Sequence, residues 1–276
     1  MNKIQIKEQL RKYNIRPNKT MGQNFLINKD TLERIIKAAD LNKDDIVLEV
    51  GPGLGILTKE LIKQSKKVIA IEKDEQMINV LKQELGDCEN LKIIHGDVLD
   101  EIKNSKLKIQ DYKVVANIPY YLTSHLIRTL LESENQPKEI VLLIQKEVAE
   151  RICAHSHRTG QVKMNLLAVS VQFYGIPEII SYVPKENFLP EPKIDSAIIK
   201  ITNIKKPDNI DIKKFFKLIK AGFSSPRKQL ANNLSNGLNL DKEEIKKALA
   251  ECNLNIQARA SNLSIEDWVS LLELTN

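Results

Sequence analysis

Short apolar runs alternate with amphipathic stretches through the middle of the chain. The runs are rich in Val and Ile and nearly all apolar, as in strands that are buried on both faces of a parallel sheet. They cover 46–50, 67–72, 91–95, 113–117 and 139–145. The stretches between them repeat with the period of a helix, at 55–65, 74–85 and 123–134. This alternation predicts an α/β fold with an open, doubly wound, Rossmann-like sheet and right-handed crossovers.

The pattern changes toward the end of the chain. After a further predicted helix at about 161–174, two β-rich runs at 178–183 and 194–201 flank a proline-rich segment. They predict an antiparallel hairpin at the sheet edge. Beyond a Lys-Lys-Pro step at 205–207, four stretches have helical periodicity, at 210–222, 225–236, 241–252 and 264–274. We therefore expect a catalytic domain over 1–204, with a basic N-terminal arm, and a small all-α domain over 205–276.

Composition excludes several classes of protein. The 276 residues are 42% hydrophobic and 28% charged, as in ordinary globular proteins. No apolar run approaches the roughly 20 residues of a membrane helix, and the N-terminus has no signal-peptide core. The three cysteines are widely spaced without a CxxC pair, which indicates reduced thiols. We expect a cytoplasmic protein that makes no membrane contact.

Positive charge gathers in two segments. Residues 1–29 hold seven Lys or Arg against Glu8 alone, and residues 205–230 hold eight against two Asp. Such segments are either solvated faces or surfaces that bind a polyanion through its phosphates. Charge alone does not decide between these interpretations. For an RNA partner, the candidate contacts are Arg11, Lys12, Arg16, Lys19, Arg227 and Lys228.

A glycine-rich loop and two acids follow consecutive predicted strands. The loop is Glu49-Val-Gly51-Pro-Gly53-Leu-Gly55, in which glycine allows sharp turns and close approach to a ligand. Glu72 ends the second strand, where a carboxylate can accept ribose hydroxyls, and Asp97 follows the third, where it can bind an adenine amino group or cap a helix. These positions converge on the crevice where open α/β sheets bind ligands. With no phosphate-binding Lys-Ser/Thr after the loop, they predict S-adenosylmethionine as the cofactor.

The fourth strand ends in Asn117-Ile-Pro119-Tyr120. An exocyclic adenine nitrogen is a poor nucleophile because its lone pair is delocalised into the ring. The Asn117 amide oxygen and a nearby backbone carbonyl can accept its two N–H bonds and direct the lone pair. Pro119 fixes the carbonyl geometry, and the ring of Tyr120 offers a face for an unstacked base. Alone, the tetrapeptide is equally a turn with a buried aromatic ring.

From about residue 17 onward, the chain resembles the KsgA/RsmA family, the S-adenosylmethionine-dependent dimethyltransferases of small-subunit ribosomal RNA. The resemblance lies in the glycine-rich loop, in the Asn117–Tyr120 tetrapeptide and in six further segments. These are Gly22-Gln-Asn24-Phe-Leu26, Ile71-Glu72-Lys-Asp74, Gly96-Asp97, Gln145-Lys-Glu147, Phe188-Leu-Pro190-Glu-Pro192-Lys-Ile-Asp195-Ser196 and Phe223-Ser-Ser-Pro-Arg227-Lys228. The last two distinguish this family from the erythromycin-resistance methylases of large-subunit RNA.

The resemblance implies a reaction and a set of roles. Four methyl groups would pass to the N6 atoms of two adjacent adenosines in the 3′-terminal hairpin of 16S rRNA, within the immature small ribosomal subunit. The cofactor would contact Asn24, Leu26, Gly51, Gly53, Glu72, Asp97 and Asn117. The target adenine would be held by Asn117 and Pro119 and stacked between Tyr120 and Phe188. Where the family often has an arginine, this chain has Pro226, which we expect to begin the next helix.

Other functions stay open from the residues. A large-subunit RNA methylase would share the active site, a DNA adenine methylase more often has proline in place of Ile118, and a binding factor would lack turnover. A nicotinamide-dependent enzyme is excluded because Ile56 stands at the sixth position of the motif G-x-G-x-x-G, where such enzymes have glycine. The pair His155 and His157 lies in a polar loop with few acids, so we expect no metal. We expect a monomer because no dimer-specific apolar stripe is visible.

Overall fold

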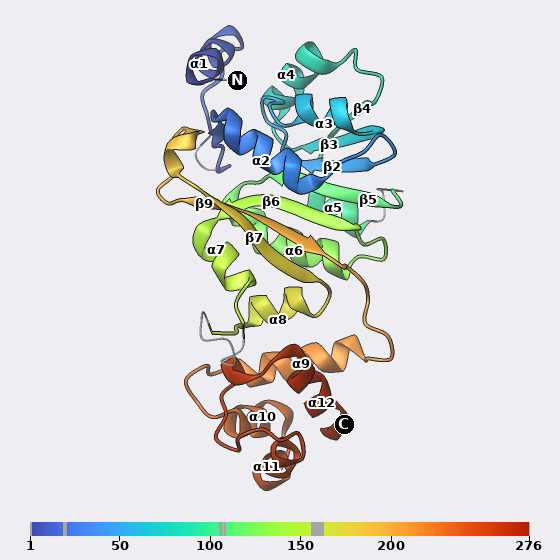
Figure 1. Cartoon of the computed structure of the whole chain (residues 1–276), viewed down its shortest axis with the longest axis vertical. Coiled ribbons are helices and arrows are strands. Elements are labelled where there is room, and N and C mark those ends of the chain that lie inside the picture. The colour runs from blue at the N-terminus through green and yellow to red at the C-terminus, as the bar shows by residue number, and fades with distance from the viewer. Residues whose placement is uncertain (1, 19–20, 105–106, 108, 156–162, 276) are drawn as a thin grey trace. The chain divides into compact units, whose positions relative to one another are not determined.

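The computed structural model describes residues 2–18, 21–104, 107, 109–155 and 163–275, and Figure 1 shows its elements. The chain divides into two compact units. The first contains residues 1–149 and 175–204, and the second contains 150–174 and 205–276.

A seven-stranded mixed sheet forms the centre of the first unit, in the order β4-β3-β2-β5-β6-β9-β7. The strands are β2 (Ile46–Val50), β3 (Lys67–Glu72), β4 (Leu91–His95), β5 (Tyr112–Asn117), β6 (Glu139–Gln145), β7 (Ile176–Val183) and β9 (Ser196–Thr202). The first five in the order are parallel, whereas β9 runs antiparallel to both β6 and β7. The predicted Rossmann-like sheet with an antiparallel edge pair is confirmed.

Helices cover both faces of this sheet. On one face, buried side chains of α2 (Lys29–Ala39), α3 (Thr58–Gln64) and α4 (Glu75–Leu85) share a hydrophobic core with alternate strand residues such as Val47 and Val115. The intervening strand residues face α5 (Val98–Lys103) and α6 (Thr123–Glu132), which lie behind the sheet in Figure 1. Within the described residues, no helix is long and apolar enough to cross a membrane.

Several elements of the first unit were not predicted, and the helices α2 and α5 are among them. The basic N-terminal arm contains helix α1 (Lys3–Lys12), which begins with a capping box between Asn2 and Gln5 and buries Ile6 and Leu10. Strand β1 (Phe25–Leu26) pairs with β8 (Phe188–Leu189) in a separate two-stranded sheet. Two residues are too few to show a strand period, so sequence patterning cannot reveal this pair.

The second unit is helical. It contains α8 (Leu166–Gln172), α9 (Ile212–Gly222), α10 (Leu230–Leu238), α11 (Lys242–Glu251) and α12 (Ile265–Leu274), and α7 (Lys146–Ile152) leads into it. The four predicted tail helices are present. Pro226 does not begin α10, because this helix starts at Leu230 with Gln229 as its N-cap residue. Pro226 lies in the preceding turn.

Residues 150–174, which the sequence assigned to the first domain, group with the tail helices. The ring of Phe173 stacks on Phe215 of α9 with 3.9 Å between centroids. Tyr174 lies against Phe216 of the same helix at 6.1 Å. These aromatic contacts attach the end of α8 to α9, and the chain enters the tail at Lys205, where the Lys-Lys-Pro step begins.

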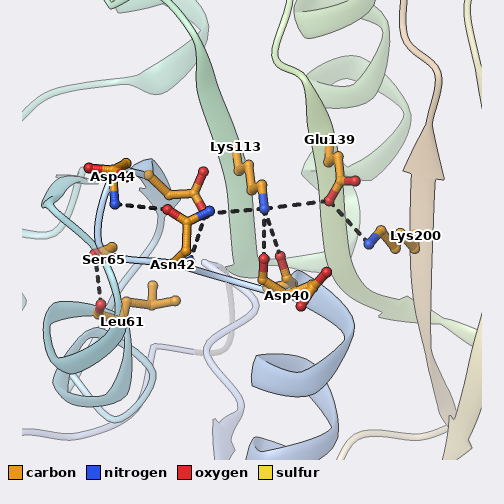
Figure 2. Close-up of polar contacts among 10 residues, drawn as sticks. Asp40, Asn42, Asp44, Leu61, Ser65, Lys113, Glu139 and Lys200 are labelled. Carbon is orange, nitrogen blue, oxygen red and sulfur yellow. Dashed lines mark hydrogen bonds and ion pairs between the residues drawn. The ribbon is translucent and has the colours of Figure 1, made fainter.

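A lysine in β5 connects the sheet to the helix that covers it (Figure 2). The Lys113 ammonium donates to the carbonyl of Asp40, at the end of α2, at 2.8 Å. It also pairs with Asp45 at 3.2 Å and lies 3.9 Å from Glu139 on β6, which pairs with Lys200 on β9. The Lys113 side chain is only 13% exposed. One partly buried cation therefore links α2, β5 and β6 at the end of the sheet opposite the carboxyl ends of the parallel strands.

Replacing Lys113 by Met removes this cation and leaves its carboxylate and carbonyl partners without it. We expect the free energy of unfolding to fall by about 2 kcal/mol, measured by urea denaturation. The matched control is Lys138→Met, whose pair with Asp111 is exposed on both sides, and which should change stability by less than about 0.5 kcal/mol. Equal effects of the two substitutions would contradict this role.

Candidate active site

A cavity opens at the carboxyl ends of the parallel strands. One wall is residues 21–26, which we call the strap, and the others are the turns that follow β2, β3, β4 and β5. The predicted site residues in its lining are Asn24, Leu26, Gly51, Gly53, Glu72, Asp97, Asn117, Pro119 and Tyr120. Segments far apart in sequence thus meet at one site, where open α/β sheets bind ligands.

The glycine-rich loop turns back on itself beside the strap. Gly51 and Gly53 have φ values of +64° and +56°, a conformation that glycine adopts readily and other residues avoid. The Gly51 N–H donates to the carbonyl of Ile71 at 2.9 Å, which holds the loop against β3. A Cβ atom at Gly53 would lie 3.2 Å from the ring of Phe25. A side chain there would therefore press on the strap.

The carboxylate of Glu72 is the centre of a backbone hydrogen-bond cluster. Its Oε1 accepts the N–H groups of Lys73 and Asp74, both at 2.9 Å, and its Oε2 accepts that of Gly53 at 3.1 Å. Burial raises the pKa of Glu72, although these three donors oppose the shift. A carboxylate offers about four acceptor positions, so roughly one is left for a ligand hydroxyl.

Asp97 takes one of the two roles considered for it, as a helix cap, and its adenine-binding role stays a prediction. Its Oδ1 accepts the N–H of Leu99 at 2.9 Å and caps α5, and its Oδ2 pairs with Lys73 at 2.9 Å. Burial acts to raise the pKa of Asp97, but Lys73 and the Leu99 N–H outweigh it and hold the pKa below its ordinary value. An ionised carboxylate thus stands in the cavity wall, as an adenine amino group would require.

The Asn117-Ile-Pro-Tyr turn holds its polar groups in defined positions. Asn117 Nδ2 donates to the carbonyl of Asn24 in the strap at 3.2 Å, which directs the amide oxygen away from that bond. The hydroxyl of Tyr120 shares a 2.8 Å hydrogen bond with Ser196 of β9. This bond fixes the ring of a residue that lines the cavity. Burial raises the pKa of Tyr120, so the phenol stays neutral.

Phe188 is the predicted site residue that the structure places elsewhere. It is 2% exposed and packs in the hydrophobic core beside the strap, and it does not line the cavity. Its backbone pairs with Leu26 of β1. In this conformation Phe188 supports the strap. Its role as the ring that stacks on the target adenine opposite Tyr120 stays a prediction.

Glu49 and Tyr121 are among the cavity residues to which the sequence assigned no role. Glu49 is the last residue but one of β2. It is 1% exposed, and its Oε2 has no hydrogen-bond partner among the described residues. A carboxylate inside an apolar strand was the available signal. Tyr121 lines the cavity beside Gly22 and is 63% exposed. No period marks it, because it lies in the short 3₁₀ turn Tyr120–Leu122.

The candidate RNA contacts divide into two groups. Arg11 and Arg16 are exposed, whereas Lys12 donates to Glu84 of α4 at 2.9 Å and so already has an anionic partner. Lys19 lies outside the described residues. Arg227 and Lys228 are exposed in the turn between α9 and α10, and α9 itself carries further exposed cations at Lys213, Lys214, Lys217 and Lys220.

The candidate metal pair is only partly visible. His155 makes an isolated backbone bridge with Lys163, and His157 lies outside the described residues. Over the described ranges no three His, Cys, Asp or Glu side chains gather as a metal site. The expectation of a protein without a metal stays a prediction.

The cavity fits a nucleoside ligand. Glu49, Glu72 and Asp97 all line it, and Glu49 carries a buried oxygen with no partner in the described structure. The carboxyl oxygens of Glu72 and Asp97 can accept hydrogen bonds from ribose and adenine, and the unpartnered Glu49 oxygen offers a further acceptor for a ligand N–H group. Next to these acids, Asn117 and Tyr120 offer an amide oxygen and an aromatic ring for a planar base. The arrangement can therefore bring an adenine amino group to a methylated sulfonium.

Comparison with known proteins gives concordant matches. Residues 14–276 match the family described as ribosomal RNA adenine dimethylase. The chain is 41% identical to ribosomal RNA small subunit methyltransferase A of Dehalococcoides mccartyi, over 97% of this chain and 91% of that protein. A dimethyladenosine transferase from Plasmodium falciparum has a similar structure, with a TM-score of 0.76 and 29% identity over 91% of this chain and 97% of that one. The 23S rRNA methyltransferase ErmE shares the fold, with a TM-score of 0.73 and 24% identity over 91% and 99% of the two chains.

The buried carboxyl group of Glu49 predicts a pH dependence of stability. Burial raises its pKa from 4.5 to about 8, so the folded chain keeps a proton that the unfolded chain loses near pH 4.5. Between these values the folded state binds more protons, and the contribution of Glu49 to stability falls as the pH rises. In urea unfolding at pH 5.5, 6.5 and 7.5, Glu49→Gln should lose less stability with pH than the wild type.

The matched control for this experiment is Glu178→Gln, which changes an exposed glutamate on β7. Its stability should follow the wild-type pH profile. Parallel profiles for Glu49→Gln and the wild type would contradict a protonated Glu49 in the folded chain.

Proposed function

The chain belongs to the ribosomal RNA adenine dimethylase family, and we propose that its substrate is the small-subunit ribosomal RNA. As a member of the family it is an S-adenosylmethionine-dependent rRNA adenine dimethyltransferase. We propose that it methylates two adjacent adenosines of the 3′-terminal hairpin, with two methyl groups on each N6 atom. The immature small subunit is the proposed partner, and small-subunit biogenesis is the proposed setting.

The observation that carries the proposal is the position of Asn117 beside an acid-lined cavity. Its Nδ2 atom is bonded to the strap, and its oxygen is the group proposed to accept an N–H of the target adenine. A carbonyl near Pro119 would accept the second N–H. With both N–H bonds held, the nitrogen lone pair is directed away from the ring system and toward the methyl donor.

The chain acts chiefly through positioning. When bound, S-adenosylmethionine supplies a methyl group on a positively charged sulfur. Glu72, Asp97, Gly51 and Gly53 would hold the nucleoside part, and Tyr120 would stack on the target base. Bringing the two groups into line supplies much of the rate enhancement. Transfer of the methyl group would leave the positive charge on the amine, whose proton would then pass to solvent. No residue has to act as a general base.

The likeness to the resistance methylase ErmE supports a common fold. A substrate on the large subunit is less favoured, because the segments 188–196 and 223–228 follow the small-subunit family. The residues that we propose to contact the target base are Asn117, Pro119, Tyr120 and Phe188. Those that we propose to bind the rRNA phosphates are the exposed Arg11, Arg16, Arg227 and Lys228. We propose that the chain works as a monomer in the cytoplasm.

The direct test of the proposed substrate is methyl transfer from labelled S-adenosylmethionine to immature small subunits. We expect about four methyl groups per subunit, recovered as dimethyladenosine. Mature small subunits and large-subunit RNA serve as controls and should stay unlabelled. Label on large-subunit RNA would move the substrate to the resistance-methylase type, and tight binding without label would indicate an assembly factor.

Asn117→Ala tests the role in orienting the adenine amino group. We expect turnover to fall at least a hundredfold, because orientation of the nucleophile is lost, while cofactor affinity stays within a few-fold. Asn104→Ala, an exposed asparagine at the end of α5, is the control and should retain full activity. If Asn117→Ala kept its turnover, the assignment would be wrong.

A further inference from the structure

We infer that Gln23 is a positioning residue for methyl transfer, because its side chain fastens the strap to Asp74 and thereby holds the strap carbonyl that orients Asn117. The inference rests on the proposed function, since it concerns how Asn117 is set for the reaction. Gln23 lines the cavity and is half-buried.

A hydrogen bond between side chains joins the strap to the turn after β3. Gln23 Nε2 donates to Asp74 Oδ2 at 2.7 Å, and these residues lie 51 positions apart. Asp74 is itself held firmly. Its Oδ1 accepts the N–H of Gln76 at 2.9 Å as the N-cap of α4, and its own N–H donates to Glu72. The strap is therefore attached to the same turn that presents the proposed ribose-binding carboxylate.

A second hydrogen bond joins the strap to Asn117. The carbonyl of Asn24, the residue after Gln23, accepts Asn117 Nδ2 at 3.2 Å. Because the nitrogen and oxygen of an amide are fixed relative to each other, this bond determines where the Asn117 oxygen points. A displacement of the Asn24 carbonyl would rotate the amide and lose the geometry needed at the adenine nitrogen.

Gln23 restrains one end of the strap. The other end is held by the pairing of β1 with β8 and by the Ile27 N–H, which donates to the carbonyl of Asn187 at 2.9 Å. At Gly22, a Cβ atom would lie 3.4 Å from Pro119, so the strap passes close to the Asn-Ile-Pro-Tyr turn. The Gln23–Asp74 bond sets the strap position just before the Asn24 carbonyl.

The chemistry of the pair permits a reversal test. Gln23→Glu places a carboxylate against Asp74 and should break the bond. Adding Asp74→Asn restores it with the donor and acceptor exchanged. The introduced amide can still cap α4 through its oxygen, and its nitrogen can donate to the carboxylate introduced at position 23. Asp74→Asn alone is the third variant.

The three variants and the wild type are compared in methyl transfer at saturating cofactor and RNA. We expect kcat of Gln23→Glu to fall about tenfold, because the nucleophile is misaligned, with the KM for RNA within twofold. The double variant should recover to within twofold of the wild type. Rates are divided by the fraction of chains that bind S-adenosylhomocysteine, which removes any loss of folded protein.

Wild-type kcat in Gln23→Glu, or a double variant no better than the single one, would overturn the inference. A drop in melting temperature without a change in kcat per binding site would show a structural role only and would also overturn it. If the wild-type chain transfers no methyl group, the proposed function fails. The dissociation rate of S-adenosylhomocysteine, faster in Gln23→Glu and restored in the double variant, then tests the strap separately.

Discussion

The buried carboxylate of Glu72 is the interaction on which the site depends. An ion at this depth is costly unless hydrogen bonds compensate for its lost hydration. Here the compensation comes from three backbone N–H groups, one in the glycine loop and two in the turn toward α4. The same bonds define the shape of both segments. The glycine loop, the turn after β3 and the N-terminus of α4 are therefore organised around one carboxylate.

Hydrogen bonds connect the other cavity walls to this turn. Asp74 accepts a hydrogen bond from Gln23 of the strap, and the Asn24 carbonyl of the strap accepts one from Asn117. Ser196 of β9 fixes the ring of Tyr120. A reaction that needs no general base depends on such alignment, because the protein contributes mainly by holding the nucleophile and the methyl donor in line.

The parallel strands were predictable because they are apolar on both faces and separated by clear helical periods. The convergence of Glu72, Asp97 and Asn117 on one cavity was predictable because each residue ends or follows such a strand. Glu49, Tyr121 and the Gln23–Asp74 bond depend on contacts between distant segments, which spacing does not reveal. The same reason explains why residues 150–174 joined the tail helices: the stacking of Phe173 on Phe215 is a tertiary contact without a local signal.

A crystal structure of the chain with S-adenosylhomocysteine would show whether the proposed cofactor site around Glu72 is preorganised. We expect a ribose hydroxyl on Glu72 Oε2, the adenine amino group at Asp97, and all three backbone N–H bonds to Glu72 unchanged. A nucleoside bound away from Glu72, or a glycine loop rebuilt around the ligand with these bonds broken, would contradict this expectation.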